Sequence, residues 1–448
     1  MKKYFLAVAS FFIYSHISLG QVYPGQMDST FVPVRSHHYD PELTFDFCVN
    51  EPAWSNQAGI HSAFGSTDRL YFRKEVPVNH DNDLSSSYST TVWRGERANA
   101  QILVWSSEAL EQVRVSTQDL RSAEGNIIPK DRITFELVRY VLSNYPYAEK
   151  KAICGESPYK SGFLMPDRFE TLDRFDLPSQ TTRPVWMMVD VPRGTVPGTY
   201  KGQVEVRAKG KAPQLLNLEI VVQNQLLPYP KDWKYRLDLW QNPWAVAWYN
   251  HVEPWSPEHK MLLKQHLKHY ADAGGTYITT YGVHSPWSDN SYMIEGGMIE
   301  WIKKADGTWA FDYKIFDEYV ELAMECGIDE AITLYTPIPW GFRHRYKDEA
   351  TGDYSYINWA PSSEEFKKMW NIFLTDFKFH LEAKSWLDIT YIGINENPME
   401  ETLAAINVVR NHDKCWKITY AGNWHKELDG LLDDYSFLYG EEPTIAEQ

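Results

Sequence analysis

Among the pairs of adjacent carboxylates in the sequence, three are candidates for chemistry, because two carboxyl groups can share the acid and base steps of a hydrolysis. They are Asp329–Glu330, Asp348–Glu349 and Glu441–Glu442. The first pair precedes a strand-like segment, where residues usually serve stability, so we expect a structural role. The second pair lies in a long loop, where a solvated turn is a simpler interpretation than catalysis. Pro443 follows the third pair and indicates a surface loop.

Three histidines on one predicted helix raise the question of a metal site. His266 and His269 are spaced to share a helix face with each other, and His259 precedes them. The same helix carries Lys264 and Lys268, which indicate an ordinary solvated surface. No HExxH-like pattern accompanies these histidines. We therefore expect no metal ion and no cofactor.

Aromatic residues are abundant, with 18 Trp, 28 Tyr and 20 Phe making up 15% of the 448 residues. This content suits a cleft for carbohydrate, where apolar sugar faces lie on aromatic rings and hydroxyls find polar partners. Candidates for such contacts, each of which could equally be structural, lie at or just after strand-like segments of the second half: Asp238, Trp240, Trp244, Tyr281, His284, Trp287, Trp340, Asn423, Trp424 and His425. The net charge of −16 argues against a nucleic-acid partner, and 43% hydrophobic residues exclude a disordered chain.

The first twenty residues have the pattern of a secretory leader. Lys2 and Lys3 precede an apolar run from Tyr4 to Tyr14, and small residues at Ser18 and Gly20 predict cleavage before Gln21. The run is shorter than the ~20 apolar residues of a membrane span. We expect an exported protein, periplasmic or extracellular, without a stable membrane anchor. Export permits disulfides, but four scattered cysteines allow three pairings and are more simply free, buried thiols: Cys48, Cys154, Cys326 and Cys415.

Residues 21–230 have the pattern of an all-β sandwich, the first of two structural domains. Short β-branched strands separated by Gly/Pro turns are predicted at 100–105, 112–117, 185–191, 203–207 and 215–222. Pro228 and Pro230 then stop any strand from continuing, so the segment 228–232 is a natural linker.

Residues 231–448 alternate strand-like and helical segments, which indicates a parallel sheet. Strands are predicted at 236–240, 277–281, 331–335, 389–394, 416–421 and 435–439, and helices at 257–273, 313–326, 363–383 and 399–412. This spacing suits a (β/α)₈ barrel, with long inserts after the second and third strands. A doubly wound open sheet is the alternative, but no Gly-rich phosphate loop follows the first strand. Since a barrel has eight β/α units and six are found here, we expect its last part to be missing.

Six stretches of the second half occur in a recognisable order: Leu237–Ala247, Trp301–Lys304, Phe311–Tyr313, Ile315–Asp317, Asp348–Gly352 and Tyr420–His425. Together they resemble glycoside hydrolase family 123, the β-N-acetylgalactosaminidases, and the resemblance covers nearly all of residues 90–445. The resemblance implies an N-terminal β-sandwich followed by a (β/α)₈ barrel, and a substrate carrying terminal β-linked N-acetylgalactosamine in glycans or glycolipids. Members of the family continue through further barrel strands and a C-terminal β-domain, which are absent from this sequence.

In that family, a consecutive Asp-Glu pair at the end of the fourth barrel strand does the chemistry. The glutamate protonates the leaving oxygen, and the aspartate holds the 2-acetamido group, which attacks the anomeric carbon in place of an enzyme nucleophile. Glu396 matches the acid/base, but Asn395 stands where the family has Asp, and Asn397 where an arginine is common. Asn395 can still accept a hydrogen bond from the acetamido N–H, but it cannot offset the positive charge that develops. Losing one such contact typically costs on the order of 10²–10³ in rate, so we expect an impaired enzyme.

Two alternatives stay open. The chain is a catalytically inactive carbohydrate-binding homologue or fragment, which Asn395 and the missing barrel end both favour. In the second alternative, the chain resembles retaining glycosidases with the same barrel fold, which place an Asn-Glu pair at the end of strand four. In those enzymes the Asn binds the 2-hydroxyl, the Glu is the acid/base, and the nucleophile comes from strand seven, which lies outside this chain.

Overall fold

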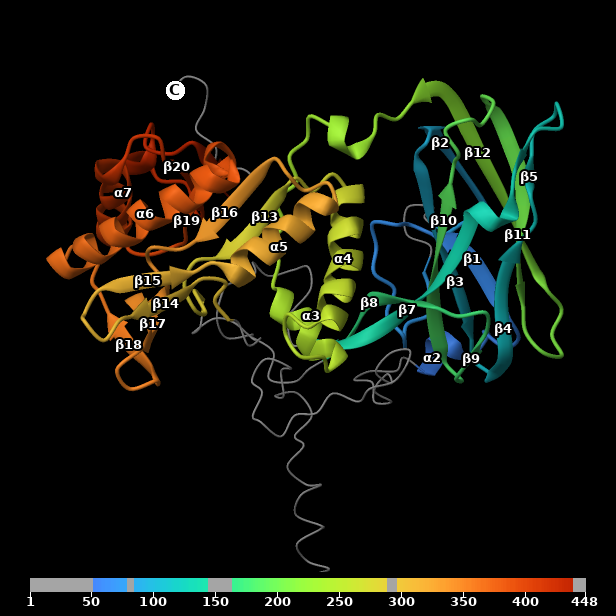
Figure 1. The fold of residues 1–448 in the computed structure, drawn as a ribbon. Coiled ribbons are helices and arrows are strands. Elements are labelled where there is room, and N and C mark those ends of the chain that lie inside the picture. The colour runs from blue at the N-terminus through green and yellow to red at the C-terminus, as the bar shows by residue number, and fades with distance from the viewer. Residues whose placement is uncertain (1–50, 79–83, 144–162, 288–295, 438–448) are drawn as a thin grey trace, which may run out of the picture. The chain divides into compact units, whose positions relative to one another are not determined.

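The computed structural model describes residues 51–78, 84–143, 163–287 and 296–437, drawn as coloured ribbon in Figure 1. These residues fall into two compact units that meet between Leu227 and Pro228. The predicted leader, Cys48, Cys154 and the pair Glu441–Glu442 lie outside the described residues. Within the described ranges, no helix is both long enough and apolar enough to cross a membrane.

The first unit consists of two β-sheets (blue to green in Figure 1) that enclose one hydrophobic core. The five-stranded sheet has the order β1-β3-β10-β7-β8, with β1 (His61–Gly65), β3 (Arg97–Ser106), β7 (Ile133–Ser143), β8 (Phe163–Thr171) and β10 (Thr181–Asp190). The seven-stranded sheet has a main path in the order β2-β12-β11-β4-β9. Its strands are β2 (Ser87–Arg94), β4 (Leu110–Thr117), β9 (Phe175–Leu177), β11 (Gly198–Arg207) and β12 (Gln214–Leu226). Two short strands lie off this path: β5 (Leu120–Arg121) pairs with β11, and β6 (Ile127–Ile128) pairs with β5. A short helix, α2 (Glu51–Trp54), precedes β1.

Alternation of side chains explains how the first unit builds its core. Along β12, Leu216, Leu218 and Ile220 point inward and are buried, whereas the residues between them are more exposed. Residues of the other sheet, such as Ile102 and Val185, join the same core. The five predicted strands lie within β3, β4, β10, β11 and β12 or overlap them. Seven strands of this unit were not predicted from the sequence: β1, β2, β5, β6, β7, β8 and β9.

The second unit contains a five-stranded parallel sheet in the order β13-β16-β19-β20-β21. The strands are β13 (Tyr277–Tyr281), β16 (Ala331–Tyr335), β19 (Thr390–Ile394), β20 (Lys417–Ala421) and β21 (Asp434–Ser436), and the helices are α3 (Pro243–Asn250), α4 (Pro257–Asp272), α5 (Lys314–Glu325), α6 (Glu364–Lys384) and α7 (Met399–His412). The spatial order follows the chain order, which disfavours a doubly wound sheet, whose order reverses at a switch point. The described residues form an open sheet, so closure into a barrel stays a prediction.

Short 3₁₀ turns complete the connections: η1 (Lys130–Arg132), η2 (Pro230–Asp232), η3 (Trp340–Phe342), η4 (Leu387–Ile389) and η5 (Lys426–Leu428).

The predicted first strand at 236–240 is wrong. Among the described residues this segment keeps a single parallel bridge, from Leu237 to Gly275. The hydroxyl of Tyr270, on α4, lies 2.7 Å from the Leu237 carbonyl oxygen and 3.3 Å from the Leu239 nitrogen. The Tyr270 side chain therefore makes the hydrogen bonds that a neighbouring strand would have made, and strand pairing ends after the single bridge.

The two long inserts, after β13 and β16, combine into one four-stranded sheet that the sequence analysis did not predict. Its order is β15-β14-β17-β18, with β14 (Glu300–Lys303), β15 (Trp309–Asp312), β17 (Arg343–Asp348) and β18 (Tyr354–Asn358). The rings of Trp301 and Phe373 stack with centroids 4.8 Å apart, which joins this insert sheet to helix α6.

The two faces of the parallel sheet differ in chemistry. Ile278, Leu334 and Ile392 alternate with residues of the opposite face and belong to the hydrophobic core shared with the helices. The other face carries a row of neighbours in register, namely Tyr281, Tyr335, Gly393, Thr419 and Asp434. This polar and aromatic face is the one that leads to the residues predicted for chemistry.

Candidate active site

Asn395 and Glu396 stand at the carboxyl end of β19, the third strand of the parallel sheet. The strand ends at Ile394 and helix α7 begins at Met399, so both residues lie in the short turn between them. Asn395 is 1% exposed, whereas Glu396 is exposed to solvent. Carboxyl ends of parallel strands are the usual place for ligands in α/β folds, and this turn has the required position.

Asn395 is buried with only part of its hydrogen-bonding capacity used. Its Oδ1 accepts a hydrogen bond of 2.9 Å from Asn397 Nδ2, which also donates to the Ile338 carbonyl oxygen at 3.0 Å. The Asn395 Nδ2 has no partner among the described residues. Buried amide groups are normally satisfied, so an unpaired one beside a surface turn is available for a ligand.

The carboxylate of Glu396 is oriented by the turn after β20. Glu396 Oε1 accepts a hydrogen bond of 3.1 Å from the backbone nitrogen of Asn423. A Cβ at Gly422 would lie 2.6 Å from Glu396 Cγ and 2.6 Å from the Tyr420 hydroxyl, so glycine is required for this approach. Burial, followed by the charge of Glu396, raises the pKa of Tyr420 to about 12, which keeps its hydroxyl protonated at neutral pH.

Aromatic side chains form a cluster on the polar face of the sheet, consisting of Trp240, Trp244, Tyr281, Trp287 and Tyr335. Trp240 stacks on Trp287 with centroids 5.1 Å apart, and both rings contact Tyr335 at 5.2 and 5.0 Å. Trp244 and Tyr281 are buried; their rings pack edge-on against each other, and Tyr281 also packs edge-on against Trp287. Trp240 is 49% exposed. Gly393 admits the Tyr335 ring, because a Cβ there would lie 2.9 Å from it.

Asp238 is a half-buried residue near this cluster, and one of its carboxylate oxygens is buried. Its Oδ1 has no hydrogen-bond partner among the described residues. Burial, with a smaller contribution from the charge of Asp434, raises the pKa of Asp238 to about 6. A carboxylate oxygen without a partner can accept a hydrogen bond from a sugar hydroxyl, and this bond would offset part of the free-energy cost of desolvation.

The other predicted sugar contacts occupy different environments. Burial, followed by the charges of Arg345 and Arg343, lowers the pKa of His284 to about 4, so its ring is neutral at pH 7. The indole nitrogen of half-buried Trp340 has no partner in the part of the chain that is described. His425 donates its backbone N–H to the Tyr435 hydroxyl at 2.7 Å. Asn423 is exposed beside Glu396, and Trp424, which follows it, is half-buried.

The remaining candidates from the sequence have structural partners. Glu349 accepts from Lys304 Nζ at 3.0 Å and from the Ala305 nitrogen at 3.1 Å, which closes a turn. Asp329 and Glu330 are exposed at the turn before β16, where the Glu330 nitrogen bonds to the Thr276 carbonyl.

His259 is buried and held at both ring nitrogens, with Nε2 2.9 Å from the Pro243 carbonyl and Nδ1 accepting from the Trp255 nitrogen at 2.8 Å. Within the described ranges, no three His, Cys, Asp or Glu side chains are grouped so as to hold a metal ion. Cys326 is a free, buried thiol as expected, whereas Cys415 is free but exposed, so the expectation of burial is wrong for Cys415.

Sequence reasoning missed Tyr335, Tyr420 and Gly422. Tyr335 ends a predicted strand, so the rule that selected the other strand-end aromatics would have found it. Tyr420 and Gly422 acquire their roles from a contact with Glu396 that joins two different β/α units. Sequence spacing does not report such a contact.

The chain is similar to known glycoside hydrolases over most of its length. Residues 64–208 match the family described as glycoside hydrolase 123 N-terminal domain, and residues 240–448 match glycoside hydrolase 123, catalytic domain. A family 123 glycoside hydrolase from Clostridium perfringens, solved to explain glycolipid glycan hydrolysis, has 26% identity and a TM-score of 0.74 over 85% of this chain and 67% of that chain.

Two more distant structures complete the comparison. A family 39 glycoside hydrolase from Bacteroides cellulosilyticus WH2 has 13% identity and a TM-score of 0.23, over 67% of this chain and 46% of that chain. A GH5 xyloglucanase from Bacteroides ovatus has 10% identity and a TM-score of 0.20, over 80% and 68%. No curated protein matches the chain.

Proposed function

Because the chain belongs to glycoside hydrolase family 123, we propose that it hydrolyses terminal β-linked N-acetylgalactosamine from glycans or glycolipids, with Glu396 as the acid/base. The observation that carries the proposal is the position of Glu396. It stands exposed at the carboxyl end of β19, with one carboxylate oxygen fixed by the Asn423 N–H. The described residues provide no partner for its other oxygen, which is therefore free to give a proton to a leaving group.

The proposed reaction has two steps that use the substrate's own acetamido group. In the first, Glu396 donates its proton to the glycosidic oxygen while the acetamido carbonyl oxygen attacks the anomeric carbon, so the bond to the leaving alcohol breaks. In the second, Glu396 takes a proton from water, and the oxygen of that water attacks the anomeric carbon and opens the ring of the intermediate. Two displacements at the same carbon retain its configuration.

Asn395 sets the efficiency of this scheme. Its Oδ1 has two lone pairs and uses one for Asn397, so it can also accept from the acetamido N–H. Because an amide is neutral, it gives less support than a carboxylate to the positive charge of the intermediate. We expect orientation of the substrate to survive and the rate to be reduced.

The aromatic cluster provides a surface for the sugar. Trp240 is half exposed and rests on Trp287, so its ring is held in place by its neighbours. Asp238, half-buried near the same cluster, is our candidate for binding a hydroxyl of the sugar. In addition, we propose export through the leader at residues 1–20, which the mass of the mature N-terminus, beginning at Gln21, would test.

Release of nitrophenol from the β-N-acetylgalactosaminide and the β-galactoside tests the proposal. The account expects hydrolysis of the first substrate alone, because the second has no acetamido group. Glu396→Gln should lower kcat/KM by roughly 10²–10⁴. The matched control is Glu400→Gln, an exposed glutamate in the first turn of α7, which should keep wild-type activity.

Two outcomes would contradict the proposal. Equal hydrolysis of both nitrophenyl substrates would rule out participation of the acetamido group. A folded protein that binds N-acetylgalactosamine and hydrolyses neither substrate would show a carbohydrate-binding protein, the alternative that Asn395 favours.

A further inference from the structure

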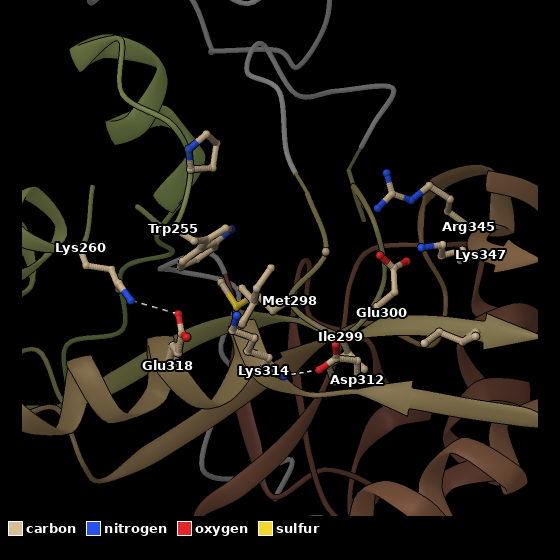
Figure 2. Close-up of a pocket in the computed structure, with 14 residues that line it drawn as sticks. Trp255, Lys260, Met298, Ile299, Glu300, Asp312, Lys314, Glu318, Arg345 and Lys347 are labelled. Carbon is tan, nitrogen blue, oxygen red and sulfur yellow. Dashed lines mark hydrogen bonds and ion pairs between the residues drawn. The ribbon is translucent and has the colours of Figure 1, made fainter. Parts of the chain in front are cut away.

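A second hollow, of about 530 Å³, lies in the same unit, and none of the residues around Glu396 lines it. Its walls come from the connection between α3 and α4, the first turns of α4 and α5, and strands β14, β15 and β17 of the insert sheet. Figure 2 shows Trp255 and Met298 on one side, with Glu300, Arg345 and Lys347 on the other. The volume falls within the range of small-molecule sites, roughly 300–1,000 Å³.

The apolar side of this hollow is a fixed aromatic wall. Trp255 is partly exposed, and its backbone N–H donates to His259 Nδ1 at 2.8 Å. Its ring packs edge-on against Trp244, with centroids 5.4 Å apart. Met298 and Ile299 lie beside it and are buried. An aromatic ring held in this way can receive the apolar face of a sugar ring.

The carboxylates of the hollow are already engaged. Glu318 pairs with Lys260 at 3.3 Å, and Glu300 Oε2 accepts from the Tyr354 hydroxyl at 2.8 Å. Asp312 Oδ1 accepts from the backbone nitrogen of Lys314 at 2.9 Å, at the start of α5. Of these three carboxylates only Glu318 lies within ion-pair distance of a cation that lines the hollow, because a hydrogen bond from a hydroxyl or a backbone nitrogen does not neutralise a carboxylate.

Three cationic side chains of the hollow form no ion pair with a carboxylate of the described residues. In the described ranges, the ammonium groups of Lys314 and Lys347 form no ion pair or side-chain hydrogen bond. The guanidinium of Arg345 lies 4.2 Å from the centre of the Tyr354 ring, and its buried Nε has no hydrogen-bond partner. Four cationic and three anionic side chains therefore line the hollow beside the aromatic wall, an excess of one positive charge in a chain whose net charge is −16.

We propose that this hollow binds an anionic saccharide, with the sugar ring against Trp255 and its carboxylate or sulfate between Lys314, Lys347 and Arg345. Ammonium and guanidinium groups form their strongest hydrogen bonds with such anions. This site is an addition to the proposed hydrolysis and does not depend on it. It would hold an acidic unit of a glycan while another part of the same glycan is processed.

Calorimetric titration of the full protein tests the site with four probes: N-acetylneuraminic acid, galactose 6-sulfate, galactose and inorganic sulfate. The proposal expects one or both acidic sugars to bind, more tightly than galactose and than inorganic sulfate. Raising the salt concentration should weaken that binding. The stronger of the two acidic probes identifies the anion as carboxylate or sulfate.

The double variant Lys314→Gln with Lys347→Gln should weaken binding of the acidic sugar by about tenfold or more, because two charged contacts are lost. Lys264→Gln is the matched control, since that lysine is exposed, pairs with Glu325 and does not line the hollow. Hydrolysis of a small nitrophenyl substrate should be unchanged in both. Binding that is undetectable, equal for galactose, equal for inorganic sulfate, or unaffected by the double variant would overturn the proposal.

Discussion

Two regions of the molecule bury different kinds of side chain. One is the core of the first unit, and the other is the polar face of the parallel sheet in the second unit. Between the two sheets of the first unit, Val113, Val204 and Ile220 are completely buried in a hydrophobic cluster. On the polar face of the parallel sheet, Thr279 and Thr333 are as deeply buried, yet their hydroxyls have no partner among the described residues. Buried apolar side chains stabilise the folded state, whereas buried hydroxyls without a hydrogen-bond partner destabilise it.

That difference is informative because each unsatisfied buried polar group costs about 1–3 kcal/mol. Asp238 Oδ1 and Asn395 Nδ2 add to the unsatisfied atoms of the second unit. Natural proteins retain such costs mainly where function requires them. We therefore take the polar face, and the strand ends to which it leads, as the functional side of the molecule.

The largest expected effect is on stability, and it comes from a substitution in the core of the first unit. Ile220→Ala removes a fully buried side chain from the sandwich core and should lower the free energy of unfolding by about 2–5 kcal/mol. Well below the melting temperature, kcat/KM should stay at the wild-type value. Thermal unfolding and nitrophenol release measure the two quantities, and a loss of kcat/KM without a change in Tm would contradict the division of roles.

Gly422→Ala tests the functional side by geometry. The added Cβ would lie 2.6 Å from Glu396 Cγ, so the carboxylate must move away from the Asn423 N–H. We expect kcat/KM to fall by about tenfold to a hundredfold, since small displacements of a catalytic group are costly. Gly194→Ala is the control, because a Cβ there meets nothing within 4 Å. Full activity of Gly422→Ala would show that Glu396 needs no such placement.

Asp238→Asn should sharpen the comparison through its pH dependence. The pKa of Asp238 is raised to about 6 from 3.8, so the folded protein binds this proton more tightly than the unfolded chain does. The ionised carboxylate therefore opposes folding, with no cost below about pH 4 and the full cost above about pH 6. The variant should be more stable by on the order of 1–2 kcal/mol at pH 7.5 and not at pH 4.

If Asp238 binds a sugar hydroxyl as proposed, the same variant should lose about tenfold in kcat/KM, because a charged hydrogen bond to the substrate would become a neutral one. Melting temperatures across pH 4–8 and nitrophenol release are the measurements. Asp329→Asn, at an exposed turn, is the control and should change neither. A destabilised Asp238→Asn protein at pH 7.5 would show that the carboxylate has a structural partner.

The smallest effect comes from a matched pair of threonines on neighbouring strands. Thr280 Oγ1 donates to the Thr333 carbonyl at 2.9 Å, whereas Thr333 Oγ1 has no partner among the described residues. Thr280→Val should therefore destabilise the protein by about 1 kcal/mol, and Thr333→Val should be neutral or stabilising by a similar amount. Chemical denaturation measures both, and equal losses would remove the contrast between satisfied and unsatisfied groups.

The parts of the fold that depend on local sequence could be predicted. Helices α4 and α6 follow from apolar periodicity and from Ser256 and Ser363, whose side chains accept hydrogen bonds from backbone nitrogens of the first turn. The segment 236–240 was predicted as a strand because its pattern is strand-like, but the Tyr270 hydroxyl replaced its ladder. The insert sheet could not be predicted, because it pairs β14 with β17 from two separate loops.

The same limit applies to the site. The position of Asn395 and Glu396 at a strand end followed from a resemblance carried by short sequence stretches. The contacts of Glu396 with the turn at Gly422 and Asn423 depend on how neighbouring β/α units approach each other. Likewise, the lack of a partner for Asp238 Oδ1 is a property of the folded sheet and not of residue 238 alone.

The most direct test of the account is the rate of nitrophenol release from the β-N-acetylgalactosaminide by Asn395→Asp. If the acetamido group is the nucleophile and Asn395 is a weakened support for it, a carboxylate at this position should raise kcat by about 10²-fold. The β-galactoside should remain unhydrolysed. An unchanged or lower rate for soluble, folded Asn395→Asp, with wild-type affinity for N-acetylgalactosamine, would contradict the proposed mechanism.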